Sequence, residues 1–329
     1  LAEWASEPCL AAPAPEGLVF LDTETTGLGR GPGTYVFLVG VGRWRNESFH
    51  LAQFFLSDPA SEPAFLAALT DYLAPCQALV TFNGKGFDVP LLNTRYIANA
   101  CPSPLPALAH LDLLPLARRL WRDRLPSRAL GSLEQYILGV TRTQEDVPGW
   151  MIPQLYFDYM RSRDARPLKS VFYHNAVDVL SMAALLQHVA GMLADPLEST
   201  GQDPLDLLGM GRLYESLEDV DTTIALYERS LRKGLPPDLA RRTREQLSFI
   251  HKRRENWAAA LELWQEAAAE GEVYACVELA KYWEHRERDF AEAQRWTLLA
   301  LSHAAASGTS HASRLRWAQE LNHRRDRLR

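Results

Sequence analysis

The sequence predicts an α/β domain followed by an all-α helical repeat domain. Short apolar, β-rich runs alternate with helical patterns up to about residue 195, and amphipathic helical spacing continues through nearly all of the rest. A polar stretch containing Pro196, Gly201 and Pro204 separates the two patterns. A chain of 329 residues is long enough for two domains. We therefore expect a flexible N-terminal tail at residues 1–15, the α/β domain at 16–198, and the helical repeat domain at 204–329.

The spacing of apolar residues places the elements of the α/β domain in chain order. Three strands come first, followed by a helix, a strand, a helix, a further strand and long helices. Ahead of the last long helix, residues 125–167 look like a helical insertion. The first strand carries Asp22 and Glu24, further strands are expected at 34–42, 47–55 and 78–82, and another ends near Asp112. The expected helices are 58–73, one entered near Phe87, and one ending near Met192.

Two acidic residues, Asp22 and Glu24, end the first apolar run. Because side chains alternate along a strand, the two carboxylates would share one face, about 7 Å apart. Carboxylates cluster where a cation sits between them, and Mg²⁺ and Mn²⁺ prefer oxygen ligands. The alternative is the polar face of an edge strand that leads into a Thr/Gly turn.

Two later segments carry further candidate groups. Asp88 follows a short strand and a glycine-containing turn, which would place it in the first turn of a helix, where an Asp often serves only as a cap. His174 and Asp178 are four residues apart and would share one helix face. The alternative for this pair is an interfacial histidine beside an exposed aspartate.

These three segments, in this order, resemble the motifs of the DEDD superfamily of 3′→5′ exonucleases, which have the ribonuclease H-like fold. Residues 22–28 match Asp-x-Glu-Thr-Thr-Gly-Leu, residues 83–88 match Asn-x-x-x-Phe-Asp, and a His precedes the last Asp. Three ordered motifs are more specific than any one alone. The resemblance covers roughly residues 16–195, and it implies that two divalent ions are bound by Asp22, Glu24, Asp88 and Asp178.

The whole chain is similar to the bacterial YprB-like proteins, in which such a nuclease domain precedes tetratricopeptide-like helices. Residues 110–114 and 146–149, together with the segments above, support this similarity. The second motif, with Pro90, Leu91 and Arg95, is also similar to the proofreading domains of family B DNA polymerases.

The general base that this resemblance implies has two candidates. One subclass has a Tyr four residues before the last Asp, and the other has a His five residues before it. Here His174 lies four before Asp178 and Tyr173 lies five before it. We favour His174, because the ordinary pKa of histidine suits a base near neutral pH. The reverse assignment stays open.

Several other residues are candidates for substrate binding. Thr25, Thr26 and Gly27 would let backbone and hydroxyl groups approach the terminal nucleotide, and Leu28 would wedge against its base or simply pack. Asn83, Lys85 and Arg95 would contact phosphate, with a turn residue or a solvated charge as the alternatives. We expect Asp112 to stabilise a strand end outside the metal site.

Beyond residue 204 the chain predicts paired helices at 205–217 with 220–233, 239–254 with 257–270, and 273–287 with 290–305, then a last helix from about 310. The second helix of each pair carries an aromatic residue, Tyr227, Trp264 or Trp296, which we expect in the core. These lie 37 and 32 residues apart, close to the tetratricopeptide period of about 34 residues. The usual turn glycine is absent, so the repeats are only tetratricopeptide-like.

Composition limits the possible classes of function. A net charge of −6 argues against a protein that binds nucleic acid through a broad basic surface. Basic residues at 241–254 and 324–329 are either solvated helix faces or a nucleic-acid track. The four scattered cysteines favour reduced thiols in the cytoplasm. We expect no membrane-spanning stretch and no signal peptide.

The sequence therefore predicts a metal-dependent 3′→5′ exonuclease that acts on single-stranded DNA or RNA. One alternative is an interaction scaffold, in which the helical repeats recruit a protein partner and the nuclease fold is vestigial. Another is a ribonuclease H-like endonuclease, which would share the two-metal chemistry.

Overall fold

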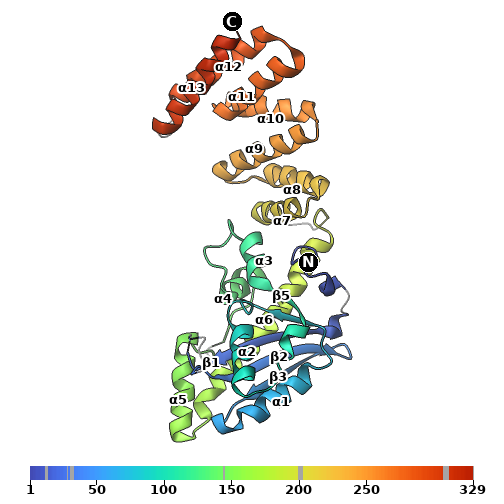
Figure 1. The fold of residues 1–329 in the computed structure, drawn as a ribbon, viewed down its shortest axis with the longest axis vertical. Helices are drawn as coiled ribbons and strands as arrows, with labels where there is room; N and C mark the ends of the chain where they lie inside the picture. Colours follow the sequence, from blue (N-terminus) through green and yellow to red (C-terminus); the bar gives the residue numbers. More distant parts are fainter. Residues whose placement is uncertain are drawn as a thin grey trace. The chain divides into compact units, whose positions relative to one another are not determined.

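The computed structural model describes residues 1–11, 14–27, 29, 33–143, 145–198, 203–306 and 311–328. The chain divides into two compact units, Leu1–Gly201 with Arg212–Glu218, and Gln202–Gly211 with Asp219–Arg329. Figure 1 shows a sheet flanked by helices in the first unit and only helices in the second. The predicted fold class, an α/β domain followed by an all-helical region, is confirmed.

The first unit is built on one five-stranded mixed sheet with the strand order β3-β2-β1-β4-β5. β1 pairs antiparallel with β2 and parallel with β4, so the strand that carries Asp22 and Glu24 lies in the middle. A central strand is covered on both faces, which explains its nearly continuous apolar run. The strands are β1 Leu18–Thr25, β2 Val36–Arg45, β3 Ser48–Phe55, β4 Ala78–Thr81 and β5 Ala109–Asp112.

Helices cover this sheet, and the long helix α6 packs against β1 and β2. Its close approach depends on Gly40 and Gly42 of β2, where a Cβ atom would meet Asn175 and Val179 of α6 at 2.2 and 2.7 Å. The helices of this unit are α1 Glu62–Leu73, α2 Asp88–Ala98, α3 Leu113–Leu120, α4 Leu130–Leu133, α5 Ile152–Ser162 and α6 Lys169–Ala194.

The apolar composition of α6 corrects one expectation. By length and composition alone, the segment Arg166–Ala194 is apolar enough to cross a membrane, so the prediction that no such stretch exists was wrong. The structure gives this composition another cause, because Val179, Met182 and Leu185 are buried in the first unit. A core helix packed on a sheet needs apolar residues just as a membrane helix does.

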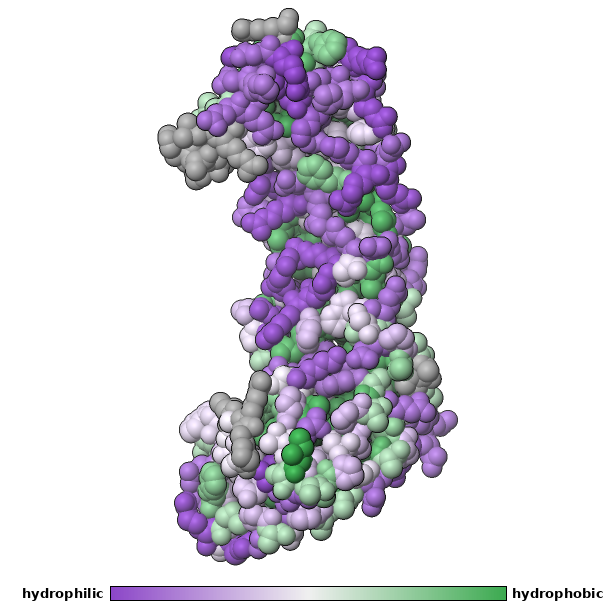
Figure 2. Space-filling model, viewed as in Figure 1, coloured by the Kyte–Doolittle hydropathy of each residue, from purple (hydrophilic) through white to green (hydrophobic). Residues whose placement is uncertain are grey.

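In the second unit, the described residues lie mostly in helices. Tyr227 and Trp264 are fully buried, as predicted, and the indole of Trp264 donates a hydrogen bond to the hydroxyl of Ser248 (3.0 Å). Trp296 is only partly buried against the core of this unit. The visible surface of the later helices is largely hydrophilic in Figure 2. The helices, with α7 divided between the units, are α7 Pro204–Ser216, α8 Val220–Lys233, α9 Pro237–Arg253, α10 Trp257–Ala269, α11 Val273–Tyr282, α12 Phe290–Ala306 and α13 His311–Arg327.

Candidate active site

Asp22 and Glu24 lie on β1, and each side chain is partly exposed to solvent but surrounded mostly by protein atoms. Burial is the main reason why the pKa of each carboxyl lies well above its usual range, and the charge of Asp178 is the next. The charge of Asp88 also raises the pKa of both groups. The structure therefore brings the four predicted carboxylates close enough to repel one another.

The other two carboxylates reach this region from helices. Asp88 begins α2 and accepts a hydrogen bond from the hydroxyl of Thr23 on β1. Burial raises the pKa of Asp88 to about 6, although the hydrogen bond from Thr23 opposes this shift. On α6, burial also raises the pKa of Asp178, and His174 and Arg142 act in the opposite direction.

Asn175 anchors Asp22, a role that we did not predict. This fully buried amide donates hydrogen bonds to the carboxylate of Asp22 (2.9 Å) and to its backbone carbonyl (3.3 Å). The amide of Gln53 donates in turn to Asn175 (2.9 Å) and to the carbonyl of Phe172 (2.8 Å). Gly40 is the β2 partner of Asp22 in the sheet, and it leaves the space that Asn175 occupies. The sequence signal for this arrangement was an Asn three residues before Asp178, on the same helix.

Replacing Gly40 by Ala should destabilise the fold and displace the anchor of Asp22. The added Cβ would lie 2.2 Å from the Oδ1 atom of Asn175, so we expect a loss of about 1–3 kcal/mol in the free energy of unfolding. Urea denaturation measures this loss. Gly191→Ala on α6 is a suitable control, because its Cβ would meet nothing within 4 Å. Wild-type stability in Gly40→Ala would contradict this packing account.

Arg142 is the main cation of the site, and no sequence pattern predicted it. Its Nε and Nη2 atoms donate to the two carboxylate oxygens of Glu134, each at 2.6 Å, and Nη2 also donates to Asp178. A weaker ion pair joins Arg142 to Asp146 at 3.5 Å. Burial alone would lower the pKa of Arg142, but the bonds to Glu134 and the charge of Asp178 raise it overall, so the guanidinium stays charged. These residues come from the segment that we expected only as an insertion.

The two candidates for the base have different surroundings. The Nδ1 atom of His174 lies 2.8 Å from Asp146 and 3.2 Å from Arg142, and its Nε2 atom lies 3.6 Å from Asp178. The hydroxyl of Tyr173 instead accepts a hydrogen bond from the backbone N–H of Thr143 (3.2 Å). His174 thus lies beside the carboxylates of Asp146 and Asp178, whereas the hydroxyl of Tyr173 contacts the backbone at Thr143.

Asp112 organises the loop that leads from β4 to Asp88. Its carboxylate accepts backbone hydrogen bonds from Asn83 (2.7 Å) and Lys85 (3.0 Å), and it also caps α3 through Leu114 (3.1 Å). The expectation that Asp112 stabilises a strand end is confirmed. Asn83 has a left-handed backbone with φ of 69°, so it is a turn residue, and its position beside a surface pocket also leaves it open to a ligand.

The remaining predicted substrate residues divide into three groups. The hydroxyl of Thr25 donates a hydrogen bond to the carbonyl of Gly27 (2.8 Å), and the hydroxyl of Thr26 accepts one from the backbone N–H of Tyr35 (2.9 Å). Both hydroxyls are thus bonded within the segment between β1 and β2. The side chain of Lys85 is half-exposed and lies 3.9 Å from Glu7. Leu28 lies outside the described residues.

Arg95 does not belong to the site. It is buried, with 4% of its surface exposed, and it forms a double hydrogen bond with the buried Glu62 at 2.6 and 2.5 Å. Its guanidinium also stacks over the ring of Tyr35 at 4.3 Å. The prediction of a phosphate contact at Arg95 was wrong, because the buried Glu62 on α1 requires this cation inside the core.

Among the described residues, no group of three or more His, Cys, Asp or Glu side chains surrounds a common point as metal ligands do. Oxygens of Asp22, Asp88 and Asp178 are instead bonded to Asn175, Thr23 and Arg142. The donor set itself still fits a divalent cation, because four clustered carboxylates face one guanidinium, and burial together with the neighbouring carboxylates raises the pKa values of Asp22 and Glu24.

Comparison with known proteins agrees with this fold. A family model described as the RNase H superfamily matches residues 19–190, which include all four carboxylates and His174. The chain is also 32% identical over 304 residues to the uncharacterized protein YprB of Bacillus subtilis strain 168, covering 91% of this chain and 72% of that protein. Members of the superfamily are usually nucleases, and they generally use divalent metal ions. This chain belongs to the RNase H superfamily.

Proposed function

We propose that this protein is a metal-dependent nuclease that removes nucleotides from the 3′ end of single-stranded DNA or RNA. The observation that carries the proposal is the meeting of four carboxylates, where burial first, and then the charges of Asp178 and Asp88, raise the pKa values of Asp22 and Glu24. They come from β1, α2 and α6, in the chain order of the DEDD exonucleases. The 3′→5′ direction and the preference for single strands rest on that resemblance.

Asp22, Glu24, Asp88 and Asp178 would hold two divalent ions, Mg²⁺ or Mn²⁺. In such sites the bound ions supply the charge that activates water and stabilises the leaving oxygen. The protein's own contribution begins with the anchors: Asn175 fixes the orientation of Asp22, and Thr23 fixes that of Asp88. Carboxylates held in this way need little reorganisation when the substrate arrives.

His174 is our proposed general base. If its Nδ1–H donates to Asp146, the Nε2 atom carries the lone pair that accepts a proton. Asp146 then orients the ring, while Arg142 and Asp178 lie on either side. Tyr173 would remain a residue that positions the loop at Thr143.

A cationic pocket supports strand binding beside this site. It has a volume of about 500 Å³, and it borders Asn83 on the loop that leads to Asp88. Arg118 of α3 is exposed, and the Nη1 atom of Arg128 donates hydrogen bonds to the backbone carbonyls of Leu125 and Pro126. No carboxylate among the described residues lines the pocket, so its two guanidinium groups are suited to phosphates of the substrate strand. Its lining residues are Phe82, Asn83, Leu114, Arg118, Pro126, Ser127, Arg128, Ala129 and Leu130.

The second unit would act as a tetratricopeptide-like array that recruits a protein partner or guides the nucleic acid. Its helices follow one another in pairs, and their aromatic residues Tyr227 and Trp264 are buried in the core. A partner would therefore bind the polar outer faces of the helices rather than an aromatic pocket.

Hydrolysis of 5′-labelled single-stranded DNA and RNA oligonucleotides with Mn²⁺ or Mg²⁺ tests the proposal. We expect a metal-dependent ladder that shortens from the 3′ end, and the better substrate identifies the preferred sugar. A circular strand should resist cleavage. Cleavage of the circle would identify an endonuclease instead, and absence of cleavage on every substrate would favour the scaffold interpretation.

A further inference from the structure

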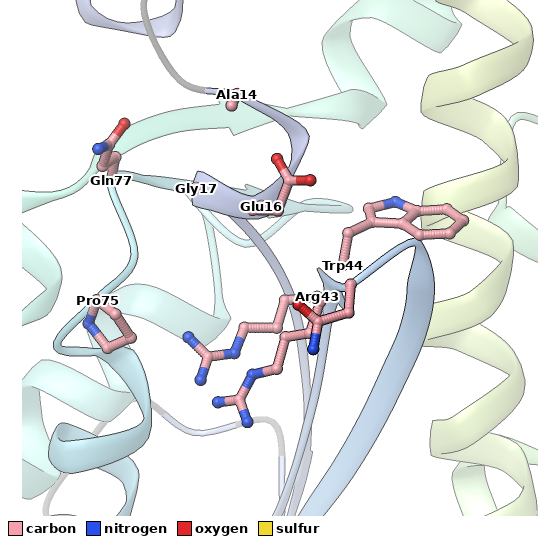
Figure 3. Close-up of a pocket in the computed structure, with 9 residues that line it drawn as sticks. Ala14, Glu16, Gly17, Arg43, Trp44, Pro75 and Gln77 are labelled. Carbon is pink, nitrogen blue, oxygen red and sulfur yellow. The ribbon is translucent and has the colours of Figure 1, made fainter.

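A second polar cavity, of about 520 Å³, lies at the other end of the central strands. Gly17 and Gln77, which line it, come just before β1 and β4, whereas Asp22 and Glu24 lie in the second half of β1. The end of β2 contributes two arginines, Arg43 and Arg45. Figure 3 shows Arg43 extending into this pocket on the side of Pro75, while Trp44 points the opposite way, toward a helix.

Among the described residues, Arg43 is a buried cation without an anionic partner. Only 6% of its surface is exposed, and its Nε atom is buried with no hydrogen-bond partner in the part of the chain that the structure describes. Its Nη1 atom donates to the sulfur of Cys76 (3.6 Å), and its guanidinium lies 4.5 Å from the ring centre of Tyr72. Burial raises the pKa values of both the Tyr72 hydroxyl and the Cys76 thiol, so both neighbours are neutral at pH 7.

Arg45 brings a second positive charge to the same place. Its guanidinium lies 5.3 Å from the centre of the Tyr72 ring, which Arg43 also contacts. Within the described part of the chain, no carboxylate forms an ion pair with either arginine. Glu16 lines the pocket, but its carboxylate points away from Arg43 in Figure 3. Two neighbouring cations repel each other, and a buried one is costly, unless an anion joins them.

We propose that the pocket around Arg43 and Arg45 binds a phosphate group. Guanidinium groups match phosphate oxygens with paired N–H donors, and this cavity brings two guanidinium groups together at the Tyr72 ring. The amides of Asn46 and Gln77 line the same cavity and can donate further hydrogen bonds. The phosphate belongs to a free nucleotide or to a nucleic-acid strand held away from the carboxylates. The assignment does not depend on the proposed nuclease activity.

Isothermal titration of the full chain tests this assignment, using inorganic phosphate, AMP and a 20-nucleotide DNA single strand as probes. EDTA is present throughout, so that no metal-dependent cleavage interferes. We expect Arg43→Met and Arg45→Gln each to weaken binding about tenfold or more, because each removes a charge-assisted hydrogen bond. Arg161→Gln is the matched control, since the side chain of Arg161 is 70% exposed and lies on α5. Because Arg45 is exposed, its variant tests the proposal even if Arg43→Met folds poorly.

The three probes separate the two sources of phosphate. Binding of phosphate and AMP that is lost in both variants would identify a small-ligand site. Binding of the strand alone, also lost in both variants, would identify a second contact with nucleic acid. Binding of no probe, or binding that stays unchanged in both variants, would overturn the proposal.

Discussion

Asp22→Asn and Asp88→Asn should each abolish hydrolysis while leaving the fold intact. Each substitution removes one of the four carboxylates that we propose as metal ligands, and we expect a loss of at least about 10³-fold in kcat. The fold should survive, because both carboxyls have pKa values raised by burial and repulsion. Exchanging such a group for a neutral amide of the same shape relieves that repulsion.

Rates are measured on the 5′-labelled strand, and folding is measured by circular dichroism and thermal unfolding. Asp71→Asn is the matched control, because Asp71 is an exposed aspartate on α1, remote from the carboxylates in sequence and fold. We expect the control to cleave at the wild-type rate. If both active-site variants kept their activity, the assignment of these carboxylates as the catalytic ligands would be wrong.

Arg142→Met should lower the free energy of unfolding by about 3–5 kcal/mol, because it leaves a buried charge without its partner. Glu134 is only 1% exposed, and both of its carboxylate oxygens accept hydrogen bonds from Arg142. Asp178 would lose its guanidinium partner at the same time. The variant should therefore be less stable in urea than the wild type, and its remaining folded fraction should depend more on divalent metal.

A double-mutant cycle with Glu134→Gln isolates this interaction. The double variant should be more stable than the sum of the two single losses predicts, since an unpaired charge no longer remains. Arg161→Met, at an exposed ion pair with Asp158, should unfold like the wild type. Additive losses in the cycle would show that Arg142 and Glu134 are not energetically coupled.

The parts of the site that the sequence could predict are those fixed by local pattern. Alternation along a strand places Asp22 and Glu24 on one face, and helical spacing places His174 beside Asp178. The role of Asp112 also follows from its position between a strand and a helix. The order of strands and helices, including the helical second half, follows from apolar periodicity in the same way.

The parts of the site that the sequence could not predict depend on contacts between segments that are far apart in the chain. Arg142 lies in a loop without periodicity, and only folding brings it to Asp178, 36 residues away. The amide of Asn175 reaches Asp22 across 153 residues because Gly40 leaves room for it. Arg95 is the opposite case: the sequence motif predicted a phosphate contact, but in the structure Arg95 is paired with the buried Glu62 of another helix. Sequence spacing carries none of this information.

Titration of Mn²⁺ into the metal-free protein, followed by calorimetry, tests most directly whether the four carboxylates form a metal-dependent catalytic centre. We expect the wild-type protein to bind Mn²⁺, Asp71→Asn to bind it equally well, and Asp22→Asn to bind it at least about tenfold more weakly. Equal binding by Asp22→Asn and the wild type, or no binding by either, would contradict the account.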